Sequence, residues 1–269
     1  MTSRSFKTVA GAATLLVAGV ALAGLLPDPP FTGGGFNAPT ATVLKQEQAV
    51  GKVITKYVGA RTKCDQKALA SLQKSNAAVD LPGVAAAQVA WSACVATANT
   101  KYVAARDKLL LAGTPACLNQ AGIDGIKNAL DVQLPLLGGI VYCDAFYGVD
   151  PVTLMNVPQT TVFVKSEIAV AKAATKAGIA AGKCYTKAAS TVFKNLGVLP
   201  AADLTKFNDC IAKASAGGAA AVAKLVAAAT LPTCLPGATA NAVMAAAVGL
   251  GGGFNDETYC ASPSGAFID

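Results

Sequence analysis

Histidine is absent from the 269 residues. Its absence removes the commonest general base, the usual zinc ligand and every Ser-His or Cys-His nucleophile pair. The fifteen acidic residues are scattered singly, apart from the adjacent pair Asp256 and Glu257. Neighbouring carboxylates in a loop do not flank a scissile bond, so we interpret this pair as a solvated loop. The sequence therefore predicts a protein that is not an enzyme.

Other chemical signatures are missing as well. No Cys-x-x-Cys occurs, which argues against a zinc site and against redox catalysis by a thiol pair. No glycine-rich phosphate loop of either common spacing occurs, so a nucleotide cofactor is not expected. The chain has only 16 aromatic residues, and its helical segments are crowded with alanine and glycine. Small side chains let helices approach closely, which argues against a large ligand cavity.

The first residues are typical of an export signal. Arg4 and Lys7 precede an apolar run, and Ala21 and Ala23 provide the small-x-small pattern that signal peptidase cleaves. We expect residues 1–23 to be a signal peptide and residues 24–39, rich in proline and glycine, to be an extended leader. An uncleaved membrane anchor is the alternative interpretation. We expect no later segment to be long and apolar enough to span a bilayer, and therefore no membrane span after cleavage.

Eight cysteines in an exported chain favour disulfides, because oxidising compartments preserve them. Their spacing falls into two similar sets of four. Each cysteine of the second set lies 116 to 120 residues after its counterpart, and both sets begin with Lys-Cys-x-x-Lys-Ala. Agreement at four positions indicates an internal duplication. The eight candidate disulfide residues are Cys64, Cys94, Cys117, Cys143, Cys184, Cys210, Cys234 and Cys260.

Apolar residues at helical spacing indicate that each copy begins with an antiparallel helical hairpin. The expected helices cover about 40–75 and 84–111 in the first copy, and 161–196 and 200–229 in the second. Cysteines equidistant from a turn face each other, which predicts Cys64–Cys94 and Cys184–Cys210. A short third helix follows each hairpin, within 117–143 and at 240–250. Equal 26-residue steps suggest the further pairs Cys117–Cys143 and Cys234–Cys260.

The predicted fold class is all-α, with two tandem three-helix repeats, each an antiparallel hairpin plus a short third helix, stapled by disulfides. Repeat 1 covers residues 40–150, a linker covers 151–160, and repeat 2 covers 161–269. If the bridges form within each repeat, the two repeats are separate folding units. Loss of the Cys184–Cys210 bridge would then destabilise the second repeat more than the first.

The positive charge suggests what the protein contacts. Lys63 and Lys67, like Lys183 and Lys187, lie one helical turn apart, where they would solubilise a helix face or grip an anionic polymer or surface component. Because the lysines do not run together in the sequence, no nucleic acid is expected as a partner. We expect a secreted, periplasmic or cell-surface protein with a structural or binding role at or outside the envelope. The alternative is a carrier of a lipid or other apolar ligand between its helices.

Overall fold

The computed structural model describes residues 38–74, 81–143, 149–150, 155–156, 160–253 and 258–260. Within this part of the chain the protein is helical. The predicted signal peptide, most of the leader, most of the 151–160 linker, and the Asp256–Glu257 pair lie outside the described residues.

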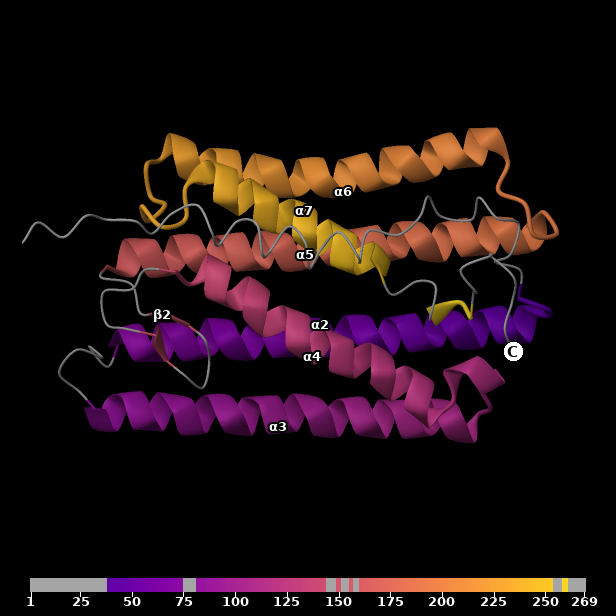
Figure 1. Cartoon of the computed structure of the whole chain (residues 1–269), viewed down its shortest axis with the longest axis horizontal. Helices are drawn as coiled ribbons and strands as arrows, with labels where there is room; N and C mark the ends of the chain where they lie inside the picture. The colour runs from indigo at the N-terminus through magenta and orange to yellow at the C-terminus, as the bar shows by residue number, and fades with distance from the viewer. Residues whose placement is uncertain are drawn as a thin grey trace, which may run out of the picture.

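Four long helices lie side by side in one layer. They are α2 (Ala41–Lys74), α3 (Leu81–Leu111), α5 (Thr161–Lys194) and α6 (Ala201–Ala227). Figure 1 shows α2 and α5 in the middle of the layer, with α3 outside α2 and α6 outside α5. The colours also show that α2 and α5 run in opposite directions. A hydrogen bond from Gln48 near the start of α2 to Ser190 near the end of α5 fits this antiparallel order.

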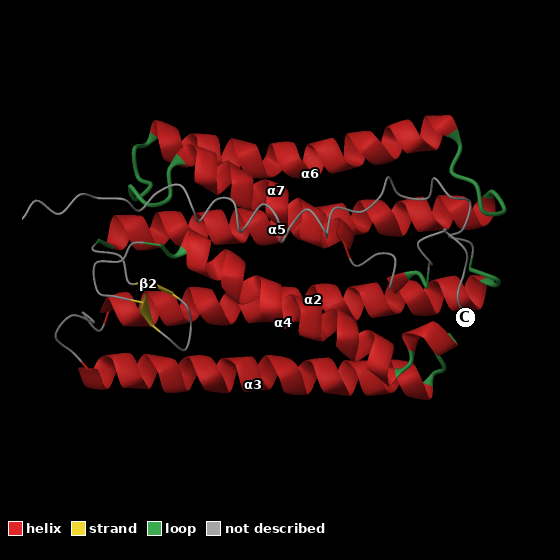
Figure 2. Ribbon diagram, viewed as in Figure 1, coloured by secondary structure: helices red, strands yellow, loops and turns green. Residues whose placement is uncertain are grey.

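Two further helices cross one side of this layer. The 3₁₀ turn η1 (Ala116–Leu118) leads into α4 (Gln120–Val141), and α7 (Gly237–Gly253) follows α6. Figure 2 shows both helices lying obliquely across the long ones. Two-residue strands β1 (Val149–Asp150) and β2 (Met155–Asn156) pair antiparallel, and β2 falls inside the segment expected to be a linker.

Local sequence signals explain where the second hairpin turns. α5 begins after Thr160, whose hydroxyl accepts a hydrogen bond from the amide of Phe163 as an N-terminal cap. It ends before Gly197, which has a φ of 94°, a conformation that glycine adopts without strain. Pro200 directly precedes α6, and Asp203 lies in the first turn of that helix near the positive end of its dipole. The hairpin predicted from these residues is therefore present.

The central helices bury like residues that lie 120 positions apart. Val50 of α2 and Val170 of α5, 120 positions apart, are both fully buried. Glu47 and Glu167 are related in the same way and are also buried. Apolar side chains of α4 and α7 complete the clusters around these two helices. The core is thus built on the inward faces of α2 and α5.

The disulfides follow the prediction within the hairpins and depart from it elsewhere. Cys64–Cys94 joins α2 to α3, and Cys184–Cys210 joins α5 to α6, which confirms both hairpin pairs. The pairs Cys117–Cys143 and Cys234–Cys260 are wrong. The structure instead has Cys117–Cys260 and Cys143–Cys234, with Cα–Cα distances of 5.8 Å in both.

The exchanged disulfide pairing bears on whether the two halves of the chain are separate folding units. Because the third cysteine of each set is bonded to the fourth cysteine of the other, two covalent links cross between the halves. The prediction that all bridges form within separate front and back units is therefore wrong. The third helices lie across the central pair, which brings the end of each half beside the other half.

The expectation that no later segment is long and apolar enough to span a bilayer also needs correction. Of the described helices, α6 is long and apolar enough to cross a bilayer by length and composition. A single helix of this kind is weak evidence for a span, and α6 is disulfide-bonded to α5.

Candidate functional site

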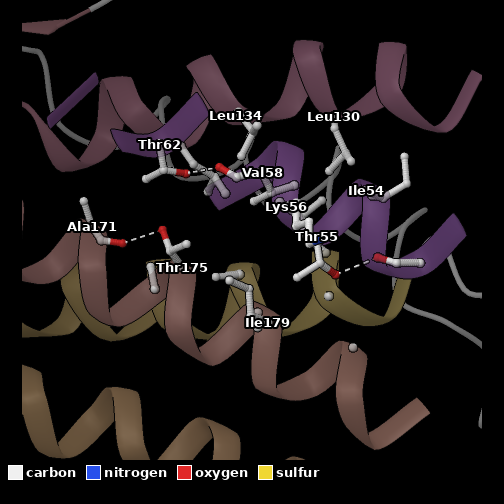
Figure 3. Close-up of a pocket in the computed structure, with 18 of the residues that line it drawn as sticks. Ile54, Thr55, Lys56, Val58, Thr62, Leu130, Leu134, Ala171, Thr175 and Ile179 are labelled. Carbon is white, nitrogen blue, oxygen red and sulfur yellow. Dashed lines mark hydrogen bonds between the residues drawn. The ribbon is translucent and has the colours of Figure 1, made fainter. Parts of the chain in front are cut away.

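A cavity of about 380 Å³ lies between α2, α4, α5 and α7. Figure 3 shows Ile54 and Val58 of α2, Leu130 and Leu134 of α4, and Ile179 of α5 around it. This volume falls in the range of small-molecule pockets. The expectation that the alanine- and glycine-rich helices would close such a space is wrong.

Different side chains at equivalent positions explain why the space stays open. On the α7 side, Gly178 and Gly251 let the helices touch, since a Cβ built on Gly251 would come within 2.2 Å of the Gly178 carbonyl oxygen. On the α4 side, the residues 120 and 117 positions earlier are Val58 and Leu134, and both line the cavity. Larger side chains on α2 and α4 therefore separate those helices, while α7 packs directly on α5.

The threonines in the wall do not make the cavity polar. The hydroxyls of Thr55, Thr62 and Thr175 donate to carbonyl oxygens one turn earlier in their own helices, at 2.8 Å in each case (Figure 3). Thr186 does the same at 3.0 Å. Because these donors are satisfied within the helix backbone, the four threonines add no free hydroxyl donor to the cavity. The lining also includes the Asp65 carboxylate, which Arg61 and Trp91 occupy, and the hydroxyls of Tyr142 and Tyr259. Most of the rest of the wall is apolar and suits a hydrocarbon.

The exposed residues of the lining are all cationic. Lys52, Lys56 and Lys183 are exposed, whereas every other lining residue is buried or partly buried. These three lysines are therefore the members of the lining with large solvent exposure. Lysine can lay its aliphatic stem along an apolar wall and keep its ammonium group in water.

These three belong to a larger set of lysines on the central helices. Six lysines of α2 recur in α5, each 120 residues later, and all twelve are exposed. In both helices they are separated by seven or four residues, which places them along one strip of the helix. We call the two strips together the lysine face: Lys45, Lys52, Lys56, Lys63, Lys67, Lys74, Lys165, Lys172, Lys176, Lys183, Lys187 and Lys194.

The lysine face carries no opposing charge from its own helices. The acidic residues of α2 and α5 are Glu47, Asp65 and Glu167, and all three are buried. The structure gives none of the twelve lysines an ion pair with a described residue. The strip lies about half a helical turn from Ile54, and its members Lys52, Lys56 and Lys183 also line the cavity. Within the described part of the chain, no ion pair therefore neutralises these ammonium groups.

A groove of about 900 Å³ extends along the lysine face between α2 and α3. Its lining includes Lys56, Lys63 and Lys67 from α2 and Lys101 from α3. Lys63 and Lys67, one of the two sequence-predicted lysine pairs, thus line the groove. Lys183, from the other pair, lines the cavity together with Lys52 and Lys56. Sequence reasoning missed the other eight lysines, although their constant offset of 120 residues was a readable signal.

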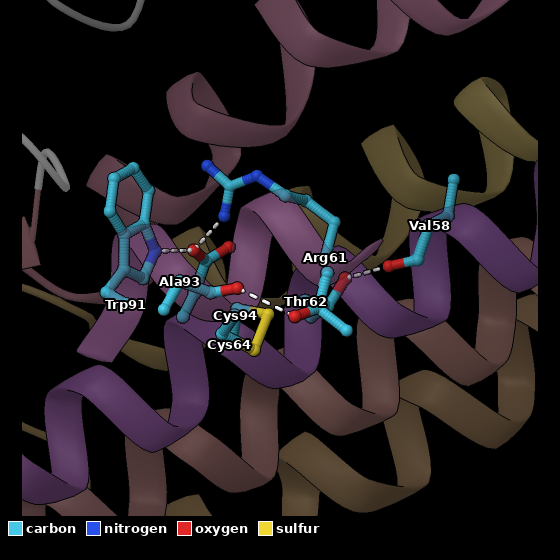
Figure 4. The surroundings of a disulfide bond; sticks show 9 residues. Val58, Arg61, Thr62, Cys64, Trp91, Ala93 and Cys94 are labelled. Carbon is cyan, nitrogen blue, oxygen red and sulfur yellow. Dashed lines mark hydrogen bonds and ion pairs between the residues drawn. A yellow bond between two sulfur atoms is a disulfide. The ribbon is translucent and has the colours of Figure 1, made fainter. Parts of the chain in front are cut away.

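The disulfide Cys64–Cys94 is supported by a buried polar cluster (Figure 4). Asp65 accepts hydrogen bonds from Arg61 and, at 2.8 Å, from the indole nitrogen of Trp91. The Arg61 guanidinium carbon also lies 4.8 Å from the centre of the Trp91 ring. Burial raises the pKa of Asp65, although Arg61 and Trp91 oppose the shift. Since these partners occupy the carboxylate, we interpret the cluster as a structural link between α2 and α3.

The cysteines themselves offer no metal site in the described part of the chain. Cys143, Glu167 and Cys234 have ligand atoms within 4.8 Å of one another, but the two sulfurs form a disulfide with each other.

Comparisons with protein families, with curated proteins and with solved structures found no match for this chain.

Proposed function

We propose that this protein is an exported binding module that recognises a linear anionic polymer at or outside the cell envelope. The lysine face is the observation that carries this proposal. Its strips are each roughly 44 Å long, at 1.5 Å per residue from Lys45 to Lys74. Periodic charges along two antiparallel helices suit a polymer whose own negative charges repeat along its length.

The compartment agrees with this function. Four disulfides suggest an oxidising, extracytoplasmic environment. We propose that residues 1–23 direct the chain there and are then removed, which leaves a secreted, periplasmic or cell-surface protein.

The matched positions support a tandem duplication as the origin of the lysine face. We propose that residues 40–150 and 161–269 are two copies of one three-helix unit. Their equivalent residues include the lysines, the four cysteines of each set and the buried pairs Val50–Val170 and Glu47–Glu167. In this view the duplication doubled a six-lysine strip into a surface with twice the charge.

A polymer suits the lysine face better than a bilayer does. Helices that lie on membranes combine basic residues with inserted apolar side chains. The large exposed apolar residues of the described chain include none from α2, and Val162, in the first turn of α5, is the single one from that helix. The groove beside Lys63 and Lys67 provides a place for an extended strand instead.

Dextran sulfate provides a test of polymer binding by isothermal titration calorimetry. Replacing Lys63, Lys67, Lys183 and Lys187 by Gln should weaken binding about 10- to 30-fold in low salt, because each exposed ion pair contributes roughly 0.2–1 kcal/mol. Binding by the unaltered protein should also fall steeply with salt, since the Debye length shrinks from about 10 Å at 0.1 M to about 3 Å at 1 M.

A matched control separates this face from net charge. Replacing Lys108, Lys206, Lys213 and Lys224, which are exposed on α3 and α6, removes the same charge elsewhere and should have a much smaller effect. Equal losses in the two variants would contradict the proposal. So would stronger binding to phosphatidylglycerol vesicles than to the polymer.

The cavity favours a second function, the carriage of an apolar ligand, which does not depend on polymer binding.

A further inference from the structure

We propose that the central cavity binds one single-chain anionic amphiphile, such as a medium-chain fatty acid. The hydrocarbon chain would lie between α2, α4, α5 and α7, and the headgroup would lie among Lys52, Lys56 and Lys183. This inference names the ligand class for the carrier function and is independent of the polymer.

The shape and chemistry of the wall define the ligand's body. The lining consists largely of leucine, isoleucine, valine, alanine and glycine, and the hydroxyls of Thr55, Thr62, Thr175 and Thr186 are bonded within their own helices. A volume of about 380 Å³ holds roughly a dozen groups the size of a water molecule, at about 30 Å³ each. A methylene group is of similar size. The cavity therefore fits one chain of about 10 to 14 carbons.

The position of the lysines defines the headgroup. Because the exposed members of the lining are Lys52, Lys56 and Lys183, we expect the polar end of a bound ligand to meet their three ammonium groups. None of the three has an ion-pair partner among the described residues. A carboxylate, sulfate or phosphate headgroup satisfies this site, whereas a cationic headgroup is repelled.

Calorimetry with dodecanoate below its micelle-forming concentration tests the proposal on the full-length protein. We expect a stoichiometry of one and an affinity that rises about fourfold for each added methylene up to about a dozen carbons. 1-Dodecanol has the same chain without the charge and should bind at least tenfold more weakly. Equal affinity for the acid and the alcohol would contradict the headgroup assignment.

Surface variants test the lysines without disturbing the core. Replacing Lys52, Lys56 and Lys183 by Gln should weaken dodecanoate binding about tenfold and leave dodecanol binding unchanged. Replacing Lys45, Lys74, Lys165 and Lys194, at the ends of the lysine face, should weaken dextran sulfate binding but not dodecanoate binding. Failure of the polymer proposal and failure of the amphiphile proposal therefore give different results.

Filling the cavity tests the chain site. Thr55→Leu on α2 and Ala174→Leu on α5 each place extra carbon atoms in the lining and should abolish dodecanoate binding. Far-UV circular dichroism identifies any variant that fails to fold. Because the two substitutions lie on different helices, one folded variant is enough for the binding test. If folded filled variants bind dodecanoate as the unaltered protein does, the cavity is not the site and the proposal is wrong.

Discussion

At the scale of single residues, tyrosine burial gives the protein a distinct response to alkali. Burial raises the pKa of Tyr142 and raises that of Tyr259 to about 12, against about 10 for an exposed tyrosine. The pKa values of Tyr57 and Tyr102 are also raised, first by burial and then by hydrogen bonds to Asp131 and Asp124. These phenols therefore stay protonated to a higher pH in the folded protein than in the unfolded chain.

This difference predicts a loss of stability in alkali. A pKa raised on folding contributes stability that is complete below the unfolded value, near pH 10, and is lost as pH rises toward the folded value, about 12 for Tyr259. When the pH of the native protein is raised, phenolate absorbance should therefore increase well above pH 10. The increase should coincide with the loss of the helical circular dichroism signal. Titration of all tyrosines near pH 10 with the helices intact would contradict the burial described above.

Residue-level reasoning from the sequence succeeded where the signal is local. The apolar spacing, Gly197 and Pro200 mark real helix ends, because caps and turns depend on adjacent residues. The cavity was missed because it depends on which side chains meet across helices. Counting alanines and glycines did not reveal that Val58 and Leu134 stand opposite each other where Gly178 and Gly251 meet in the other half.

At the scale of helices, the contact of α5 with α7 depends on Gly178. A Cβ at this position would lie 2.7 Å from the carbonyl oxygen of Ala247, a backbone atom that cannot move aside alone. Gly178→Ala should therefore separate the two helices and lower the free energy of unfolding, by about 1–3 kcal/mol for overpacking of this kind. Urea denaturation measures the change.

Gly59 provides the matched control for this substitution. It also lies within a long helix, α2, but a Cβ there would meet no atom within 4 Å. Gly59→Ala should stabilise the protein by about 0.5–1 kcal/mol, because alanine favours the helix more than glycine does. A similar change in both variants would show that helix propensity, and not the helix contact, governs Gly178.

At the scale of the whole molecule, the crosswise bridges join the two halves. Peptide mapping without reduction should recover Cys117 linked to Cys260 and Cys143 linked to Cys234, alongside Cys64–Cys94 and Cys184–Cys210. Recovery of Cys117–Cys143 instead would contradict the fold. Because the halves are linked, removal of the Cys184–Cys210 bridge should weaken hydrogen-exchange protection in both.

The sequence could not decide between these two pairings. When a unit is duplicated, the third and fourth cysteines of one copy match those of the other, so bonding within copies and bonding between copies give the same spacings and the same symmetry. Helical hairpins are different, because their cysteines face each other across a short turn. The choice for Cys117 and Cys143 depends on where α4 and α7 cross the central helices, which is a long-range property.

The opposite directions of α2 and α5 have a consequence for how the lysine face meets its partner. Because the same lysine spacing runs along two antiparallel helices, we expect the surface to present the same order of lysines when it is turned end for end. A polymer strand that approaches from one end of the lysine face therefore meets the same order of lysines as a strand that approaches from the other end. Recognition of this kind ignores the chemical polarity of the strand, so one protein can engage neighbouring strands that point in opposite directions.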